Sequence, residues 1–325
     1  MPIRTPLCDL FDIEHPVLLA PMAGVSGGVL AAAVSEAGGL GLIGGGYGDA
    51  DWLMREFEAA GNAGVGVGFI TWSLARQPDL LDLALDRSPA ALMLSFGNFK
   101  PFLHRIRESR AKLVVQVQTL DQAREAVDAG VDAIVAQGTE AGGHGGVRAT
   151  LPFVPAVVDL AQGIPVIAAG GIADGRGLAA ALALGAAGAL CGTTFFASGE
   201  SLANDNAKHA AVCGSGDDTE RSSVFDLARG LDWPSDWNLR TMRNAFTRRW
   251  SEDMSGLRQN LAAEQDRFHA ASAAGDTDII PVIVGEAADL VRTIEPAQDT
   301  LHRMITQTED HLRRLSRFVA PNNKG

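Results

Sequence analysis

The chain has few cysteines and a shortage of basic side chains. Of its 325 residues, three are cysteines, Cys8, Cys191 and Cys213, and none share a CxxC spacing. This count excludes a disulfide framework and disfavours a thiolate metal site, so a reducing, cytoplasmic location is expected. With 27 Lys and Arg against 39 Asp and Glu, the net charge of −12 disfavours partners such as nucleic acid or anionic membranes.

Aromatic residues are also scarce, at 6%, with Tyr47 as the single tyrosine. A β-sandwich or an aromatic nucleic-acid platform usually carries more. The long uncharged run over 178–198 contains Gly185, Gly188 and Gly192. We interpret this run as a helix end, a turn and a buried strand rather than a membrane span. The amino terminus has no apolar signal region, which also agrees with a cytoplasmic protein.

Short apolar runs alternate with amphipathic stretches from residue 17 to about residue 213. Continuous apolar runs are typical of parallel strands that are buried on both faces. The predicted strands are Val17–Met22, Gly39–Gly44, Val65–Ile70, Ala91–Phe96, Lys112–Val117, Asp132–Gln137, Pro165–Ala169 and Gly188–Phe195. Eight consecutive strand–helix units predict an α/β fold, a (β/α)₈ TIM barrel, which typically takes roughly 250 residues. An open doubly wound sheet is the alternative, but no long reversal connection supports it.

The last part of the chain, residues 214–325, has a different character. It begins with a polar stretch, contains three of the five tryptophans, and has helical patterns over 260–274 and 289–318. A short strand is predicted over Ser223–Asp226. We therefore expect a TIM barrel over 1–213 and a mainly helical C-terminal cap or extension over 214–325, packed on the barrel. The two parts could also be counted as one domain.

Active sites of such barrels lie at the carboxyl ends of the strands. The loop after the seventh predicted strand begins with Gly170 and Gly171, and the eighth strand ends near Gly192 and Thr193. Many barrels bind a phosphate between these two loops, where glycines let main-chain amides approach an anion. Tight packing at turns is the alternative explanation for the glycines, and the pairing of the two loops favours phosphate.

One histidine lies where chemistry is expected. His144 follows the sixth predicted strand in a flexible-looking, glycine-rich loop over 138–146. Histidine is the usual general base near neutral pH. The alternative is a turn histidine packed on the next loop. Glu140 lies four residues earlier, but no further ligand accompanies the two, so we expect no metal site.

The loop after the first strand and two glutamines complete the expected site. Pro21 and Met22 would place backbone groups and a soft side chain at the barrel mouth, which suits a flavin ring. Gln116 and Gln137 lie in otherwise apolar strands, and a buried amide needs a partner. That partner is either a flavin edge with its ribityl hydroxyls or a neighbouring backbone group.

Together these segments resemble the nitronate monooxygenase family, over about residues 14–244. The most specific matches are residues 20–24, 138–145, 169–175 and Gly192-Thr193. The resemblance implies non-covalently bound FMN and a catalytic role for His144. It implies a phosphate site at Gly170, Gly171, Gly192 and Thr193, and a ring and ribityl site at Pro21, Met22, Ala23, Gln116, Gln137, Ala141 and Gly142. One group of the family has Asn in strand three, where this chain has Val67-Gly68-Phe69, so residues 65–70 look more similar to the group that does not need reduced nicotinamide.

The reaction implied by the resemblance is oxidation of an alkyl nitronate by O₂ to a carbonyl compound and nitrite. The partners would then be a small-molecule substrate and O₂, and His144 would remove the α-proton of a neutral nitroalkane. One alternative is an FMN-dependent reductase that uses NADH or NADPH, such as a quinone reductase or the enoyl-acyl carrier protein reductase, which has a similar Glu-x-Gly-Gly-His loop. Another is a non-catalytic barrel that binds a phosphorylated metabolite. The sequence is compatible with a homodimer but does not determine the oligomeric state.

Overall fold

The computed structural model describes residues 3–318 and confirms the expected barrel. Its strands are β1 (Val17–Leu19), β2 (Leu42–Gly44), β3 (Gly66–Ile70), β4 (Ala91–Ser95), β5 (Lys112–Val117), β6 (Ala133–Gln137), β8 (Val166–Ala169) and β9 (Gly188–Cys191). They form one parallel sheet in the order β1-β9-β8-β6-β5-β4-β3-β2. A parallel bridge between Leu18 and Leu40 joins β1 to the segment before β2, so the ends of the sheet meet.

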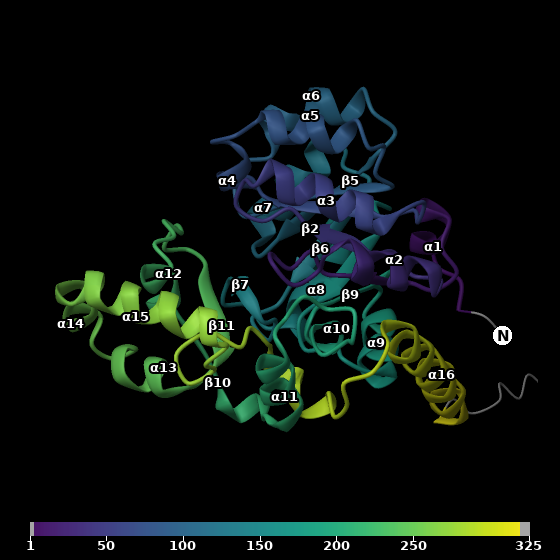
Figure 1. Cartoon of the computed structure of the whole chain (residues 1–325). Coiled ribbons are helices and arrows are strands. Elements are labelled where there is room, and N and C mark those ends of the chain that lie inside the picture. The colour runs from purple at the N-terminus through teal and green to yellow at the C-terminus, as the bar shows by residue number, and fades with distance from the viewer. Residues whose placement is uncertain (1–2, 319–325) are drawn as a thin grey trace, which may run out of the picture.

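Helices follow the strands and surround the barrel, except that the first helix precedes β1 (Figure 1). They are α1 (Pro6–Phe11), α2 (Gly28–Glu36), α3 (Ala50–Ala60), α4 (Thr71–Leu74), α5 (Asp79–Leu85), η1 (Lys100–Phe102), α6 (Leu103–Arg107), α7 (Leu120–Asp128), α8 (Thr150–Leu160), α9 (Gly175–Ala183), α10 (Thr193–Phe196) and α11 (Asp205–Cys213). Asp49 caps α3 by accepting from the Trp52 amide. Thr119 caps α7, because its hydroxyl accepts from the Gln122 amide.

Alternate residues of each strand supply the two faces of the buried core. Leu18, Met93 and Val135 belong to the cluster inside the barrel, and Leu7 of α1 packs among them. Val17 and Leu19 belong to the larger cluster between the strands and the helices. Burial on both faces explains why continuous apolar runs predicted these strands.

The predicted eighth strand is too long. β9 ends at Cys191, and the rest of the apolar run, Thr193–Phe196, forms α10. Both pieces are buried, and a buried strand and a buried helix turn have the same apolar composition. Among residues 3–318, no helix is both long and apolar enough to cross a membrane, and the uncharged run over 178–198 is divided between α9, β9 and α10.

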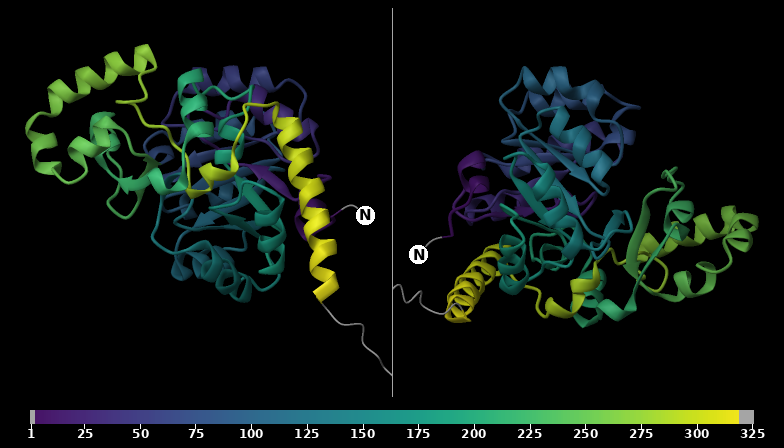
Figure 2. Two further views of the ribbon diagram at one scale, coloured as in Figure 1. Left: turned by 90° about the horizontal axis from the view of Figure 1, so that it is seen from below. Right: turned by 180° about the vertical axis from the view of Figure 1, so that it is seen from behind.

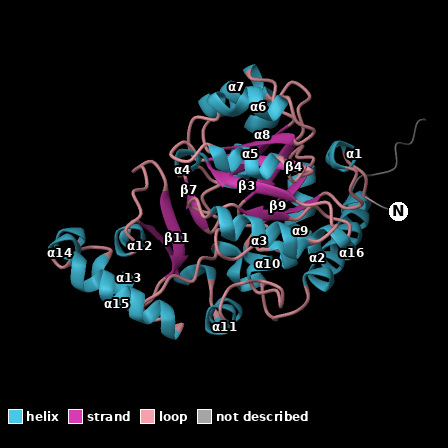
Figure 3. Ribbon diagram, turned by 45° about the horizontal axis from the view of Figure 1, so that its top comes forward, coloured by secondary structure: helices cyan, strands magenta, loops and turns pink. Residues whose placement is uncertain are grey.

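A separate lobe, which we call the cap, lies beside the barrel and is built around a second sheet (Figure 1). Its strands are β7 (Gly143–Gly145), β10 (Thr219–Ser222) and β11 (Asn238–Met242), and its helices are α12 (Val224–Ala228), α13 (Ala245–Trp250), α14 (Met254–Gln259) and α15 (Leu261–Ala274). The sheet is antiparallel in the order β10-β11-β7, and Figure 3 shows β11 beside β7. The predicted strand at Ser223–Asp226 was misplaced, because the strand precedes it and α12 occupies most of that segment.

The chain returns to the barrel after the cap. A short η3 (Glu286–Leu290) leads to α16 (Ala297–Leu315), which packs against α9 and α2 along the side of the barrel, and η4 (Ser316–Phe318) follows it (Figure 2). The helix predicted over 289–318 therefore begins later than expected. The division into 1–213 and 214–325 stays a prediction, and α16 of the second segment lies in the helical layer of the barrel.

Candidate active site

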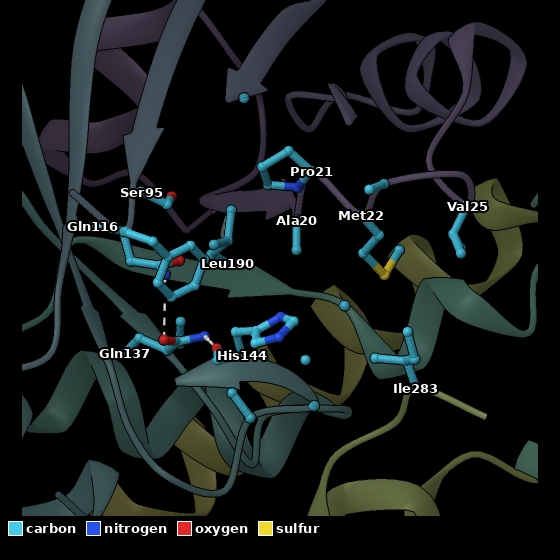
Figure 4. A pocket seen from close by; sticks show the side chains of 18 of the residues that line it. Ala20, Pro21, Met22, Val25, Ser95, Gln116, Gln137, His144, Leu190 and Ile283 are labelled. Carbon is cyan, nitrogen blue, oxygen red and sulfur yellow. Dashed lines mark hydrogen bonds between the residues drawn. The ribbon is translucent and has the colours of Figure 1, made fainter. Parts of the chain in front are cut away.

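One cavity opens at the carboxyl ends of the barrel strands and contains about 1210 Å³ of empty space, part of it open to solvent. Cofactor and substrate sites of TIM barrels lie at this end of the strands, so the cavity is the candidate site. Its lining includes every site residue singled out from the sequence, namely Pro21, Met22, Ala23, Gln116, Gln137, Ala141, Gly142, His144, Gly170, Gly171, Gly192 and Thr193 (Figure 4). The structure thus brings these residues together, and their individual roles stay predictions.

Glycine loops with left-handed backbone form one wall of the cavity. Gly170 and Gly171 have φ values of +108° and +72°, which glycine adopts without strain. A Cβ at Gly170 would lie 2.9 Å from Oγ1 of Thr150 and 3.0 Å from the carbonyl oxygen of Gly138. Thr193 is the first residue of α10. Its hydroxyl oxygen accepts a hydrogen bond from the Gly285 amide at 2.9 Å. A larger residue at position 170 or 171 would therefore be strained, and the main chain itself lines the cavity there.

Three glutamine side chains, two of which line the cavity, form a hydrogen-bonded group. Nε2 of Gln116 and Nε2 of Gln118 both donate to Oε1 of Gln137, at 3.2 and 3.0 Å. Nε2 of Gln137 donates to the backbone carbonyl of His144 at 3.1 Å (Figure 4). Gln137 therefore has the backbone partner that was one of the two expectations. Its bond also ties the end of β6 to the strand that carries the histidine.

His144 lies in β7, an edge strand of the cap sheet, and not in a flexible loop as its glycine neighbours suggested. Its Nε2 lies 2.9 Å from Oδ1 of Asp226, and the two side chains are 6% and 5% exposed. Trp233 stacks on the imidazole with ring centroids 3.4 Å apart and an interplanar angle of 8°. One ring nitrogen and one ring face are therefore occupied by protein groups.

Burial lowers the pKa of His144 below its usual value of 6.5, more than the hydrogen bond and charge of Asp226 raise it. Burial thus favours the neutral form of the imidazole. Because Asp226 accepts from the Nε2–H, the lone pair is left on Nδ1. A neutral, oriented imidazole in a cavity can accept a proton from a bound molecule.

Glu140 and His144 do not form a metal pair. The carboxylate of Glu140 accepts from the hydroxyl of Thr150 at 2.7 Å and from its amide at 2.9 Å, whereas His144 is bonded to Asp226. Among residues 3–318, no group of three or more His, Cys, Asp or Glu side chains is arranged to hold a metal ion.

An arginine from the cap clamps the loop that leads to His144. Arg221 of β10 donates to the carbonyl oxygens of Thr139, Ala141 and Gly143. Burial lowers the pKa of Arg221 to about 10, so its guanidinium still carries a charge at neutral pH. Arg240 of β11 donates to the Thr139 carbonyl as well, at 3.0 Å. The conformation of residues 139–143 is therefore set from the cap.

Aromatic residues form the wall next to His144, and none of them was predicted as part of the site. The cavity lining includes Tyr47, Phe96 and Trp233, and Trp233 donates from Nε1 to the Tyr47 hydroxyl at 3.0 Å. Asp226 was missed too. The signal available in the sequence was the cluster of tryptophans in the tail, but the pattern alone does not show which of them reaches the barrel.

Comparison with known proteins decides the family. The nitronate monooxygenase family model matches residues 4–83 and 73–307. This chain belongs to the nitronate monooxygenase family. As a nitronate monooxygenase family member, it is an oxidoreductase enzyme.

The proteins similar to this chain are named for more than one activity. The nitronate monooxygenase of Paraburkholderia phytofirmans is 31% identical, with 96% of this chain and 97% of that protein covered. The (3aS,4S,5R,7aS)-5-hydroxy-7a-methyl-1-oxo-octahydro-1H-indene-4-carboxyl-CoA dehydrogenase of Mycobacterium tuberculosis is 37% identical over 213 residues, 64% of this chain. That match spans only 60% of the length of the dehydrogenase. Among solved structures, FabK of Thermotoga maritima superposes with a TM-score of 0.84 at 32% identity, covering 98% of this chain and 100% of FabK.

Proposed function

We propose that this family member is an FMN-dependent nitronate monooxygenase, which oxidises alkyl nitronates, and nitroalkanes after loss of their α-proton, with O₂ to carbonyl compounds and nitrite. The observation that carries the proposal is the placement of a neutral, Asp226-bound His144 in the same cavity as Gly170, Gly171 and Thr193. A proton acceptor and an anion cradle in one pocket are what a flavin-dependent oxidation of an acidic carbon needs.

The residues present fit FMN. Gly170, Gly171, Gly192 and Thr193 would hold its phosphate, because main-chain amides free of side chains and one hydroxyl are suited to an anion. The net charge of −12 makes such a local anion site necessary. The ring and ribityl chain would contact Pro21, Met22, Ala23, Gln116, Gln137, Ala141 and Gly142, which line the same cavity. Bound there, FMN supplies the electron transfer between a nitronate and O₂.

His144 would act before electron transfer, on neutral nitroalkanes. Its lone pair on Nδ1 would accept the α-proton, and the charge that develops on the ring would be stabilised by Asp226 at 2.9 Å. A preformed nitronate has already lost this proton and would not need the base. The two substrates therefore separate the base from the rest of the site.

His144→Gln is the sharpest test, because glutamine keeps an N–H donor for the buried Asp226 but cannot accept a proton. We expect the variant to bind FMN and to lose about 10²–10⁴-fold of its turnover of neutral nitroethane, with a much smaller loss for ethyl nitronate. Nitrite release under air is the measurement. His104→Gln, on an exposed face of α6, is the matched control and should leave both rates unchanged. Equal losses on both substrates would contradict the base role.

A reductase or dehydrogenase that uses NAD(P)H is the second candidate. It is supported by the 37% identity to a protein named as a CoA-thioester dehydrogenase and by the Glu140–His144 loop, which is similar to that of the flavin-dependent enoyl-acyl carrier protein reductase. Anaerobic mixing distinguishes the two. Fast bleaching of the flavin by NADH or NADPH would favour the reductase, and bleaching only by nitronate would favour the monooxygenase.

A further inference from the structure

One cationic side chain faces the substrate region without a partner of opposite charge. Among the described residues that line the cavity, Arg229 is the only one whose side chain is charged at neutral pH. It follows α12, three residues after Asp226, and is half-buried. The rest of the lining is apolar, aromatic, amide or glycine, apart from the hydroxyls of Ser95 and Thr193 and the imidazole of His144.

Arg229 makes no ion pair within residues 3–318. Its guanidinium carbon lies 5.5 Å from the centre of the Tyr47 ring, and the carboxylate of Asp226 is instead bonded to His144. A cation that is half-buried in an apolar cavity loses hydration and gains stability from an anion that enters. An anionic ligand in the cavity would therefore be stabilised by the charge of Arg229.

The position of Arg229 relates that ligand to the reacting groups. Tyr47, which lies under the guanidinium, accepts a hydrogen bond from Trp233, and Trp233 is stacked on His144. The charge of Arg229 is also among the causes that lower the pKa of His144, after burial. Arg229 and His144 thus belong to the same side of the cavity, the wall supplied by the cap.

We propose that Arg229 binds the anionic head group of the substrate, and that the natural substrate is a small organic anion with a planar, two-oxygen head and an apolar body. The planar guanidinium fork can donate two parallel hydrogen bonds to a nitronate or a carboxylate. Phe96, Tyr47 and Trp233 offer an apolar surface for the body of the molecule. This inference rests on the proposed function and names the chemistry that its substrate must have.

A binding experiment tests the proposal without relying on turnover. Butanoate and butanamide have the same shape but differ in charge, and tryptophan fluorescence is used to follow their binding to the holoenzyme, because Trp233 lines the cavity. We expect wild type to bind butanoate at least about tenfold more tightly than butanamide, as for one lost charge-assisted contact. Arg229→Met should remove this preference, and Arg229→Lys should keep part of it.

Arg76→Met is the matched control. Arg76 also lies over an aromatic ring, 4.9 Å from the centre of Trp72, but it is outside the cavity lining. This variant should keep the full preference for butanoate. The proposal is overturned if wild type shows no preference, if Arg229→Met retains it, or if Arg76→Met loses it equally. If Arg229→Met does not fold, Arg229→Lys carries the test, and an undiminished preference in that variant overturns the proposal.

Turnover of butyl nitronate, measured alongside, separates the two proposals. A clear preference for butanoate without nitronate turnover would contradict the proposed reaction and leave the anion site intact. Nitronate turnover that is unchanged in Arg229→Met, together with unchanged butanoate binding, would contradict the anion site and leave the reaction intact.

Discussion

Single residues decide the chemistry of this site because each of them is held by a specific neighbour. His144 is fixed on three sides, by Asp226 at Nε2, by Trp233 on one ring face and by Gln137 at its backbone carbonyl. Fixing an imidazole in this way selects its tautomer and its direction. The sequence predicted the histidine, but not its orienting carboxylate, because Asp226 lies 82 residues further along the chain.

Asp226→Asn tests the orienting role at the scale of one residue. An amide oxygen can still accept from Nε2–H, so the geometry is preserved while the charge is lost. Asp226 raises the pKa of His144 against the dominant effect of burial, so its loss should lower that pKa further. The ascending limb of kcat/KM against pH for nitroethane should therefore move to lower pH, and kcat should fall.

Asp232→Asn is the control for this measurement. Asp232 is 85% exposed and pairs with Arg76, so its pH profile should match wild type. An Asp226→Asn profile with an unmoved limb would contradict electrostatic coupling between Asp226 and His144, and would reduce Asp226 to a packing role.

At the scale of elements, the strands of the barrel were predictable and β7 was not. Barrel strands are buried on both faces and therefore have continuous apolar runs, as in Ala91–Ser95. β7 is Gly-His-Gly, which has no apolar pattern, and it is a strand only because β11 pairs with it. The excess length predicted for β9 has a different cause. β9 and α10 are both apolar, and apolar composition does not show where the strand ends and the helix begins.

Arg221→Met tests the clamp between β10 and the loop before His144. The change removes the arginine donor from the carbonyl oxygens of Ala141 and Gly143, whereas the Thr139 carbonyl keeps its bond from Arg240. Leaving partly buried carbonyls without a donor should lower the free energy of unfolding by about 3 kcal/mol. Urea unfolding gives this quantity, and nitronate turnover should fall with it because residues 139–143 lose their fixed conformation.

Arg243→Met is the control, since Arg243 directly follows β11, the strand next to β10. Arg243 pairs with Glu220 while its side chain is 48% exposed, and such pairs contribute about 0–1 kcal/mol. If both variants lose equal stability, the clamp has no special role. If Arg221→Met keeps wild-type stability and turnover, the loop is held by other contacts.

At the scale of the whole molecule, the barrel is completed by the end of the chain. α16 packs against α9 and α2. In the sequence it follows the residues that form the cap, so the chain leaves the barrel and then returns to it. The sequence indicated a barrel and an extension but not this return, because an amphipathic helix has the same pattern whether it packs on a barrel or on a cap. Which cap residues reach the cavity was hidden for the same reason, since tertiary packing decides it.

Leu301→Ala tests whether α16 is an integral part of the barrel. Leu301 is fully buried in the core cluster between strands and helices, so truncating it should lower the free energy of unfolding by about 2–5 kcal/mol. Leu315→Ala, at an exposed position of the same helix, should change it by less than about 0.5 kcal/mol. Urea unfolding followed by circular dichroism measures both. Equal, small effects would show that α16 is dispensable for the barrel.

The place of β7 has a consequence for how the enzyme would open. β7 leaves the barrel between β6 and α8, yet all of its strand pairing is to β11 of the cap. A hinge movement of the cap would pull the imidazole out with it, together with Asp226, Trp233 and Arg229. Opening the cavity to a substrate and removing the base from the site would then be a single movement. His144 would be in position to accept a proton only in the closed conformation.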